Sequence, residues 1–332
     1  MNKNEDPIWI TEADVVSVMH LGEAIDALEA GLRLEASGAA QNMVKTQAVW
    51  GGKHTLHAIG ATFEGSGFVG TKTWAHTAGG ATPLLVLWDS ETGKLKTIIE
   101  AFALGQMRTG AMSGVAARTM AAPDAGEMAI IGTGKQALTQ VAAVCAVRPI
   151  KRVRVYSPTQ ANRAAFAEKI RKADLVPDVV ESTSVEDCVK DAPIVTLVTR
   201  ANEPFLTTDM VAPGTHINAV GSISPEREEF TQDIFPRCAV LAGDSVPNIK
   251  LLSKEFKTYF KDGNWDAVKP ICQLVGADAT RPDGADLTLF KAMGMGISDL
   301  SLGVEIFRRA EAASAFRAMP HPVKVPPRLK AS

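Results

Sequence analysis

The most informative absences in this chain concern cysteine and long apolar segments. Its 332 residues include only four cysteines, which lie far apart and form no Cys-x-x-Cys pair: Cys145, Cys188, Cys238 and Cys272. A zinc site or a redox pair is therefore not indicated, and free thiols in a reducing cytoplasm are the simpler expectation. No run of about 18 apolar residues is present, which argues against a membrane span. Residues 1–7 also lack the apolar segment of a signal peptide.

The chain also has almost no excess of one sign of charge, with 35 Lys and Arg against 37 Asp and Glu. The formal net charge is −2, without long blocks of like charge, so the sequence gives no reason to expect a nucleic acid or a membrane as partner. There is no Gly-x-Ser-x-Gly turn, so hydrolase chemistry has no support. His54 and His57 lie in a strand-like segment, where positions i and i+3 face opposite sides. We therefore expect no metal site.

What the chain does contain is enough apolar sequence for two domains, since apolar residues make up 46% of it. The first part predicts a helix capped by Thr11 and an amphipathic helix over 21–37. Strands follow, with a hairpin turn at Gly51-Gly52. The predicted strands lie within 42–62, 68–74, 84–89 and 94–99. A helix is expected over 101–120, and the break at 121–126 predicts a domain boundary.

The clearest single motif follows that break. An apolar strand over 128–131 meets Gly132-x-Gly134-x-x-Ala137, and a helix-forming stretch comes next. In such a turn, free backbone N–H groups and the positive end of a helix dipole face one point, which suits a pyrophosphate. Gly132 permits the sharp turn, Gly134 lets phosphates approach, and Ala137 permits close packing. The pattern predicts a dinucleotide site and redox chemistry. Its expected cofactor-binding residues are Gly132, Thr133, Gly134, Lys135, Gln136 and Ala137.

After this motif, strands and helices alternate. Further strands are predicted over 152–156, 179–180, 194–199 and 215–220, with helices over 161–173 and 185–190. This alternation predicts an α/β fold with a Rossmann-type doubly wound parallel sheet and right-handed crossovers. A long helical region is expected over 288–310. The proline-rich tail from Ser314 predicts an extended surface segment.

The segment after the second predicted strand bears on the choice of cofactor. NAD-binding folds of this type usually place an acid there, about 20 residues after the glycines, where it bonds the ribose 2′-hydroxyl. Residues 156–163 contain no carboxylate, but Ser157 and Thr159 offer hydroxyl groups and Arg163 offers a cation. This favours NADP over NAD. The alternative is that Arg163 is a solvated residue of the next helix.

Five segments, in their order and spacing, resemble the ornithine cyclodeaminase/mu-crystallin family over nearly the whole chain. They are residues 70–73, 106–111, 131–137, 216–221 and 290–295. The resemblance implies a homodimer that combines a dinucleotide domain with a strand-rich α+β substrate and dimerisation domain. We expect the substrate domain to comprise residues 1–120 with 300–332, and the dinucleotide domain to comprise residues 121–299.

The resemblance also implies roles for individual residues. In the family, a lysine and an arginine hold the amino-acid substrate beside the nicotinamide, and Lys72 and Arg108 match these positions. A guanidinium binds a carboxylate bidentately, and a buried lysine of lowered pKa can supply a proton. Where the family often has a further arginine near residue 44, this chain has Lys45, a less directional carboxylate holder. Further cofactor contacts are implied for Thr109, Thr199, Asn218, Val220, Gly221 and Lys291.

One position departs from the ornithine cyclodeaminases of this family. They carry an aspartate, taken to assist ring closure and ammonia loss, where this chain has Ile223. Isoleucine can neither accept a proton nor hold an amine. The departure favours an NAD(P)H-dependent reductase of small imino acids, of ketimine or pyrroline-2-carboxylate type, or the reverse amino-acid dehydrogenase. The alternatives are an ornithine cyclodeaminase in which Glu228 or Glu229 replaces the aspartate, and a mu-crystallin-like protein that binds NADP(H) without turnover.

Two other polar residues receive structural interpretations. His76 follows Lys72 closely and is expected to be structural, although a place in the pocket is the alternative. Asp299 lies in the predicted C-terminal helix, where a cap or a salt bridge is the simplest interpretation.

Overall fold

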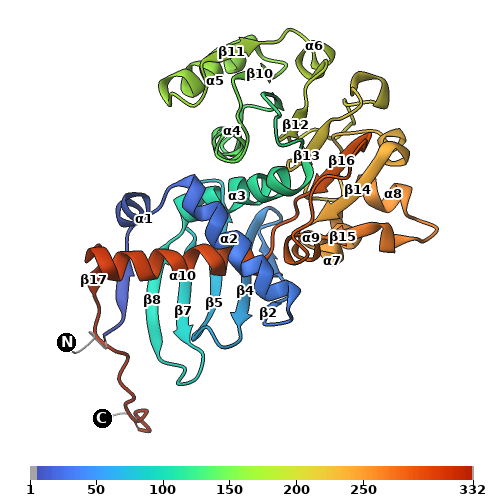
Figure 1. Cartoon of the computed structure of the whole chain (residues 1–332). Helices are drawn as coiled ribbons and strands as arrows, with labels where there is room; N and C mark the ends of the chain where they lie inside the picture. The colour runs from blue at the N-terminus through green and yellow to red at the C-terminus, as the bar shows by residue number, and fades with distance from the viewer. Residues whose placement is uncertain (1–5, 331–332) are drawn as a thin grey trace.

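The computed structural model describes residues 6–330 and contains two β-sheets with helices packed against them (Figure 1). Residues 1–5 and 331–332 lie outside the described residues, so the signal-peptide expectation for residues 1–7 falls mostly outside them. Within residues 6–330, none of the helices combines the length and the apolar character needed to cross a membrane. The α-helices are α1 (Glu12–Val18), α2 (Leu21–Ala36), α3 (Phe102–Met120), α4 (Ala137–Cys145), α5 (Gln160–Lys172), α6 (Val185–Val189), α7 (Val246–Leu252), α8 (Lys254–Tyr259), α9 (Ile271–Gly276) and α10 (Gly296–Ala313). Short 3-10 helices cover Thr208–Met210, Gln232–Arg237 and Trp265–Ala267.

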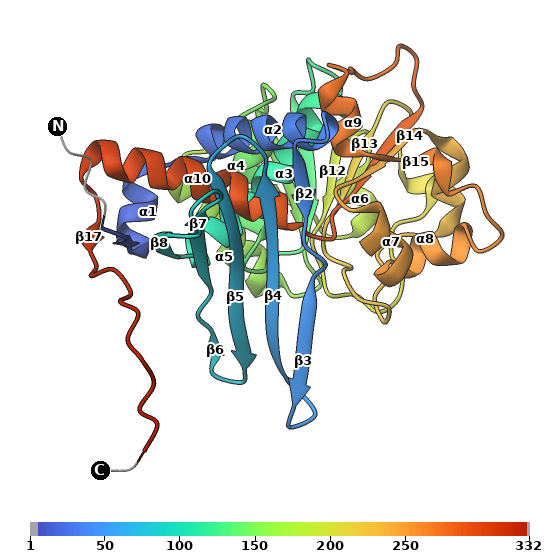
Figure 2. The same ribbon diagram turned by 90° about the horizontal axis from the view of Figure 1, so that it is seen from below.

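The first sheet is mostly antiparallel and comes from the N-terminal part of the chain, except for its edge strand β17 near the C-terminus. Its strand order is β17-β1-β8-β7-β5-β4-β2, with β3 paired to β4 and β6 paired to β5. The strands are β1 (Ile8–Ile10), β2 (Ala40–Asn42), β3 (Thr46–Trp50), β4 (His54–Phe63), β5 (Phe68–Thr77), β6 (Gly80–Ala81), β7 (Leu84–Asp89), β8 (Leu95–Glu100) and β17 (Arg317–Ala318). The predicted hairpin is confirmed, since Trp50 at the end of β3 pairs with His54 at the start of β4. Figure 2 shows β3, β4, β5 and β6 projecting beyond the helices.

Helices α2 and α10 pack against each other, and α10 lies across β4 and β5. The approach is unusually close at the first residue of α10, because a Cβ atom on Gly296 would lie 1.8 Å from the carbonyl oxygen of Gly60. A side chain at Gly296 would therefore push the helix off the sheet. The close contact fixes the first turn of α10 directly over β4 and β5.

The second sheet is entirely parallel. Its strand order is β11-β10-β9-β12-β13-β16-β14-β15. The strands are β9 (Glu127–Ile131), β10 (Arg152–Tyr156), β11 (Asp178–Glu181), β12 (Ile194–Leu197), β13 (His216–Ala219), β14 (Cys238–Gly243), β15 (Val268–Pro270) and β16 (Leu287–Lys291). The order reverses between β9 and β12, and a parallel sheet binds ligands at the carboxyl ends of the strands beside such a switch point. The predicted α/β fold with a Rossmann-type sheet is confirmed.

The predicted helical region over 288–310 is wrong in its first part. Residues Leu287–Lys291 form β16, which lies between β13 and β14, and α10 begins only at Gly296. All five residues of β16 are buried. A strand covered on both faces shows no alternation of apolar and polar residues, so its pattern cannot be told from that of a buried helix.

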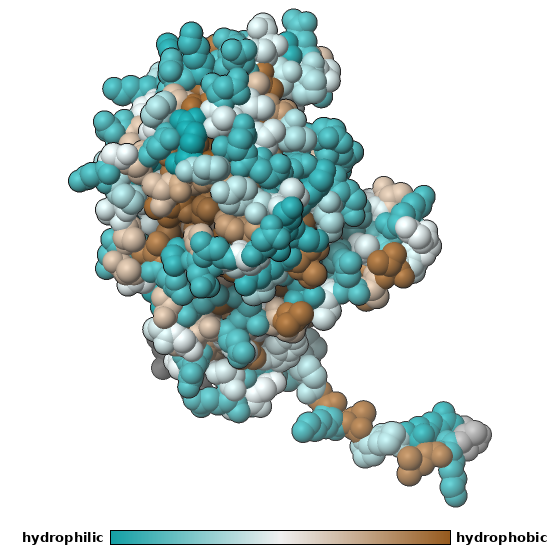
Figure 3. All heavy atoms as spheres, turned by 90° about the vertical axis from the view of Figure 1, so that its right-hand side faces the viewer, coloured by the Kyte–Doolittle hydropathy of each residue, from teal (hydrophilic) through white to brown (hydrophobic). Residues whose placement is uncertain are grey.

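Two segments connect or leave these layers. Helix α3 follows β8 directly and packs against both α2 and α4, so it lies between the two sheets (Figure 1). After α10 the chain forms the short strand β17 and then an extended tail, as predicted from Ser314 onward. Figure 3 shows this tail reaching away from the body, and Val323, Val325 and Leu329 on it are exposed.

Candidate active site

The glycine turn has the local geometry that its sequence predicts. Gly132 follows β9 with a φ of +112°, a conformation that side chains other than glycine rarely adopt. Its N–H donates to the carbonyl of Tyr156 at the end of β10, 2.9 Å away. A Cβ atom on Gly132 would lie 2.5 Å from the carbonyl oxygen of Val198, whereas a Cβ on Gly134 would meet nothing within 4 Å. Gly132 therefore holds the turn against β12, and Gly134 faces open space.

The backbone donors of this turn remain available. Among the described residues, the N–H groups of Thr133, Gly134, Lys135 and Gln136 have no hydrogen-bond partner, while Ala137 donates to Gly134 and begins α4. The turn borders a cavity of about 590 Å³. Unpaired N–H groups at a helix N-terminus bind phosphate oxygens, so the residues present fit the pyrophosphate of a dinucleotide.

The rest of this cavity comes from distant segments. Of the residues that the family resemblance implies, Thr109, Thr199, Val220 and Gly221 line it. The segment after β16 also lines it, as do Arg200 and Arg227, and none of these residues was predicted from the sequence to bind the cofactor. Asn218 and Lys291 are fully buried in the parallel sheet and do not line the cavity within the part of the chain described here.

Glu229 holds together the two loops that border this cavity. One of its carboxylate oxygens accepts hydrogen bonds from the N–H (2.7 Å) and the hydroxyl (2.8 Å) of Thr199, which follows β12. The other accepts from the N–H groups of Gly221 and Ser222 after β13, both at 3.0 Å. Burial raises the pKa of Glu229, while the nearby ammonium of Lys291 opposes that rise. Lys291 Nζ in turn donates to the carbonyl of Ser222 at 2.5 Å.

Lys72 and Arg108, the two predicted catalytic cations, lie on different elements and meet at one carboxylate. Lys72 is on β5, Arg108 is on α3, and the carboxylate is that of Asp299 in the first turn of α10. Lys72 Nζ donates to Asp299 Oδ1, and Arg108 Nε lies 3.4 Å from the same oxygen. Lys72 and Asp299 are 4% and 1% exposed. Burial lowers the pKa of Lys72 to about 8; the charge of Asp299 opposes this shift and that of Arg108 adds to it.

The part that Asp299 plays in the site was not predicted from the sequence. The salt-bridge interpretation is confirmed, but its partners were not foreseen. A signal was present, because Asp299 is the only charged residue among Gly296–Val304, a small and apolar stretch. A carboxylate in a buried helical face is almost always paired with a cation.

Lys45 lies near this cluster, but among the described residues no hydrogen bond or ion pair joins it to Lys72, Arg108 or Asp299. The residue precedes β3 and is half-buried. Burial lowers its pKa, the charge of Arg108 lowers it further, and Asp299 acts in the opposite direction. Within residues 6–330, Lys45 lines neither the cavity at the glycine turn nor a second cavity that adjoins it.

A second cavity of about 700 Å³ adjoins the first. It is lined by Lys72 and by residues from β5, β6 and the start of α3, including Trp74, Phe102 and Gln106. His76, for which a structural role was expected, is exposed and lines it. Among the residues that the structure describes, three line both cavities: Arg108, Lys135 and Gln136. The cation cluster, which consists of Lys72 and Arg108 with Asp299 between them, and the glycine turn therefore border one continuous cleft. None of the described residues that line the second part of this cleft carries a carboxylate.

The residues predicted to select the cofactor lie at the end of β10. Arg163 Nη1 donates to the carbonyl of Ser157 at 2.7 Å, and its guanidinium lies 5.8 Å from the centre of the Tyr156 ring. Thr159 precedes α5 and accepts the N–H of Arg163 on its carbonyl. Because Gly132 also bonds to Tyr156, this group is adjacent to the glycine turn.

The position of the missing aspartate lies at the cleft. Ile223 lines the first cavity and is 44% exposed. The two acids considered as replacements are occupied elsewhere, since Glu228 accepts from Gln232 and pairs with Lys254 at 2.7 Å, and Glu229 holds the two loops. Neither lines either cavity among the described residues.

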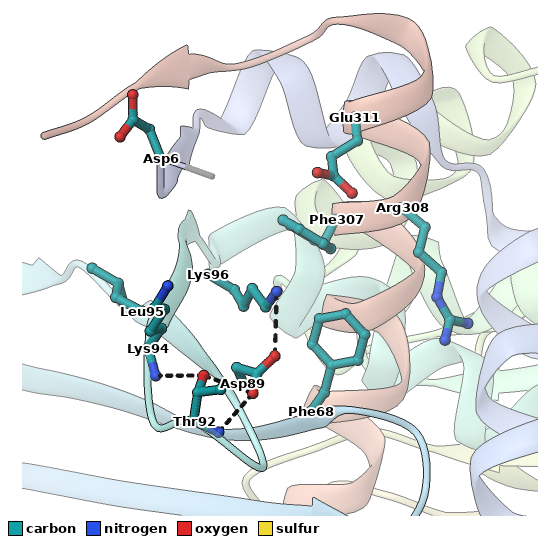
Figure 4. A pocket seen from close by; sticks show the side chains of 10 residues that line it. All are labelled: Asp6, Phe68, Asp89, Thr92, Lys94, Leu95, Lys96, Phe307, Arg308 and Glu311. Carbon is teal, nitrogen blue, oxygen red and sulfur yellow. Dashed lines mark hydrogen bonds and ion pairs between the residues drawn. The ribbon is translucent and has the colours of Figure 1, made fainter. Parts of the chain in front are cut away.

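A further cavity, of about 440 Å³, lies at the other end of α10, beside the turn between β7 and β8 (Figure 4). Phe68 and Phe307 line it, together with the Asp89–Lys96 ion pair at 3.3 Å. No residue of the glycine turn or of the cation cluster reaches it in the described structure. Its lining gives no chemical reason to regard it as the active site.

Comparison with known proteins gives a consistent picture. The model of the ornithine cyclodeaminase/mu-crystallin family matches residues 5–314. A Δ1-pyrroline-2-carboxylate reductase of Bacillus cereus is 29% identical over 231 residues, which are 68% of this chain and 70% of that protein. An ornithine cyclodeaminase of Brucella suis is 32% identical over 221 residues, 65% of this chain and 59% of that protein.

A solved structure extends the fold comparison to almost the whole chain. It is that of Thermococcus litoralis Δ1-pyrroline-2-carboxylate reductase in complex with NADH and L-proline. The TM-score is 0.86 at 24% identity, over 94% of this chain and 100% of that one. At this identity the likeness establishes the shared fold.

Proposed function

The chain belongs to the ornithine cyclodeaminase/mu-crystallin family, and from this premise we propose that it is an NAD(P)H-dependent reductase of small imino acids. In the reverse direction it would oxidise an amino acid. The observation that carries the proposal is the continuous cleft, in which Arg108, Lys135 and Gln136 border both the glycine turn and the cation cluster. A dinucleotide on one side and an anionic substrate on the other would meet at these residues.

The residues at the glycine turn would hold the cofactor. The free N–H groups of residues 133–136 would bind the pyrophosphate, and Thr109, Val220 and Gly221, which line the same cavity, would contact the rest of it. When bound, NAD(P)H supplies a hydride to the carbon of a C=N bond. The remaining steps are those that side chains of this chain perform.

Arg108 is suited to hold the substrate carboxylate. Its side chain is partly exposed at the cleft, and among the described residues it donates no hydrogen bond, although its Nε lies near Asp299. A guanidinium with unpaired N–H groups binds a carboxylate through two parallel hydrogen bonds and fixes its orientation. Lys45 would add positive charge nearby, since it is electrostatically coupled to Arg108.

Lys72 is suited to supply the proton. As the new C–H bond forms, the second electron pair of the C=N bond moves to nitrogen, which takes a proton from Lys72 Nζ. Lys72 is then neutral and regains a proton from water. Because burial lowers its pKa to about 8, Lys72 is protonated at neutral pH yet gives up the proton more readily than an exposed lysine.

Several observations favour this reductase over an ornithine cyclodeaminase. Apolar Ile223 occupies the position of the expected acid. The carboxylates of Glu228 and Glu229 are bound to other groups of the protein, and neither residue lines the cleft among the described residues. The second cavity has no carboxylate among its described lining residues. The side-chain ammonium of ornithine would therefore lie among cations without a partner, which is strongly unfavourable.

We propose NADP as the preferred cofactor, with NAD as the alternative. The loop after β10 contains no carboxylate that would repel a 2′-phosphate, and Arg163 is held there by Ser157 and Tyr156. A cation in this position accommodates the 2′-phosphate of NADP, whereas an acid selects NAD. The four cysteines are free thiols, which fits a protein of the reducing cytoplasm.

We further propose a homodimer formed through the predicted substrate domain, residues 1–120 with 300–332. All five residues of β3 are exposed, and β3 is an edge strand. Apolar side chains on and near it are also exposed: Val44, Val49, Trp50 and Leu56. An edge strand with exposed apolar groups promotes association unless it is covered. A single monomeric species in sedimentation at micromolar concentration would contradict the dimer.

The decisive assay follows NAD(P)H absorbance with the purified protein. The substrates are pyrroline-2-carboxylate, piperideine-2-carboxylate and pyruvate with an amine, each with NADH and with NADPH. We expect turnover of at least one cyclic imine. Cofactor binding without turnover of any substrate would instead support a mu-crystallin-like binding protein. Release of ammonia and proline from ornithine with catalytic NAD would establish the cyclodeaminase alternative.

A further inference from the structure

Asp299 has an environment that differs from that of an ordinary structural acid. Its Oδ1 accepts from Lys72 Nζ and lies 3.4 Å from Arg108 Nε. Its Oδ2 is buried and has no hydrogen-bond partner among the described residues. The side chain is 1% exposed, so neither oxygen reaches the cleft. Asp299 therefore contacts Lys72 and Arg108 on the side that faces away from the cleft. Any effect of Asp299 on the substrate must act through these two cations.

We propose that Asp299 is a positioning residue that keeps Lys72 protonated and directs its ammonium group toward the substrate nitrogen. This inference rests on the proposed reductase function, in which Lys72 is the proton donor. Asp299 would take no part in bond making itself. It would determine whether Lys72 enters each catalytic cycle as an ammonium or as a neutral amine.

The charges around Lys72 show why such a residue is needed. Arg108 from α3 and Lys45, which precedes β3, both oppose an ammonium at Lys72, and burial opposes it more strongly.

The remaining polar neighbours are also cationic or neutral. Lys135 and His76 line the same cavity, and His57 on β4 lies near Lys45 and His76. The Trp74 ring, 5.3 Å from Nζ, also favours a cation. Asp299 is the one carboxylate among these neighbours within the described residues.

The backbone fixes Asp299 in this place. It lies in the first turn of α10, where the positive end of the helix dipole stabilises a carboxylate. The first turn is itself pressed against β4 through Gly296 and Gly60. Lys72 on β5 pairs in register with Ile59, which precedes Gly60 on β4. The contact between Gly296 and Gly60 that positions the helix therefore also places Asp299 next to Lys72. Moving the helix would therefore separate the acid from the lysine.

The test is the pH dependence of kcat/KM for imine reduction in Asp299→Asn. The wild-type profile is expected to fall above pH about 8, as Lys72 loses its proton. Asparagine has nearly the same shape but no charge. The alkaline limb, which is the fall of kcat/KM at high pH, should therefore move to lower pH by about 1 to 3 units. Activity lost at neutral pH should return in part at lower pH, and Asp299→Glu should keep the limb near its wild-type position. A limb that stays in place in Asp299→Asn overturns the proposal.

Asp244→Asn is the matched control. Asp244 is another buried carboxylate beside the cleft, where it accepts the N–H groups of Met293 and Gly294 at 2.8 and 2.7 Å. Its loss should weaken cofactor binding by disturbing that loop, but it should leave the alkaline limb unmoved. If Asp244→Asn moves the limb as far as Asp299→Asn does, the effect is general and the proposal fails. Should Asp299→Asn not fold, Asp299→Ser serves in its place.

A measurement without substrate separates this inference from the proposed function. Titration of Lys72 by ¹⁵N-lysine NMR, assigned with Lys72→Met, requires no turnover. A lower Lys72 pKa in Asp299→Asn than in the wild type supports the role of Asp299 even if no imine is reduced. An unchanged Lys72 pKa overturns the inference even if imines are reduced.

Discussion

The two sides of the cleft are built from different parts of the polypeptide. At the glycine turn, the binding groups are backbone N–H groups of consecutive residues between β9 and α4. At the cation cluster, they are side chains from β5, α3 and α10, and Lys72 and Asp299 are 227 positions apart. Binding at the glycine turn therefore depends on the conformation of the backbone, whereas binding at the cation cluster depends on the charges of side chains.

This difference predicts different sensitivities to substitution. In the turn, most side chains can change without loss, because only Gly132 has both a positive φ and a close neighbour where a Cβ would be. In the cluster, every side chain matters, since removing one charge leaves the others buried and unbalanced. Glu229 combines both properties, as a buried charge that acts by shaping two loops.

The largest effect is expected at Arg108. Arg108→Lys keeps the charge but loses the planar pair of donors, so kcat/KM for an imino acid should fall about 100-fold or more. Steady-state kinetics would measure this, and cofactor affinity should change little. Arg118→Lys is the control, because Arg118 lies on the same helix but pairs with Asp26 and Glu29 at the surface. Equal losses in the two variants would contradict the separate role of the cluster.

A smaller effect is expected at the turn. Gly132→Ala combines strain at positive φ with a collision against the Val198 carbonyl, so we expect cofactor affinity to fall about 10- to 50-fold. Gly214→Ala imposes similar strain at a φ of +94°, but its Cβ would meet nothing within 4 Å. Both variants should lose some thermal stability, whereas calorimetric titration should show weaker cofactor binding only in Gly132→Ala. Unchanged binding in that variant would place the cofactor elsewhere.

The smallest effect concerns the choice between the two cofactors. Arg163→Ala should raise the KM for NADPH by about tenfold through loss of one charged hydrogen-bonding group, while the KM for NADH should stay nearly constant. The ratio of the two KM values is the quantity to measure. If the KM for NADH rises as much as that for NADPH, Arg163 supports the loop after β10 and does not select the cofactor.

Much of the fold could be predicted because its signals are local. The cap at Thr11, the turn at Gly51-Gly52 and the alternation of strands and helices after residue 127 each involve a few neighbouring residues. The prediction failed at β16, where burial on both faces removes the alternation that marks a strand. It also left 230–286 without assigned elements, although β14, β15, three short α-helices and two 3-10 helices lie there.

The candidate site also has one part that local sequence predicts and another that it does not. By itself the sequence determined the glycine turn, since the strand, the turn and the helix that form it are contiguous and their backbone conformation follows from the residues present. Lys72 and Arg108 were placed through family resemblance. The lone charge of Asp299 in an apolar stretch indicated that it needs a cationic partner, but not which cations it meets. Only the tertiary structure brought Asp299 to both cations, because the seating of α10 on β4 and β5 depends on packing between segments more than 200 positions apart. No pattern of neighbouring residues encodes such a contact.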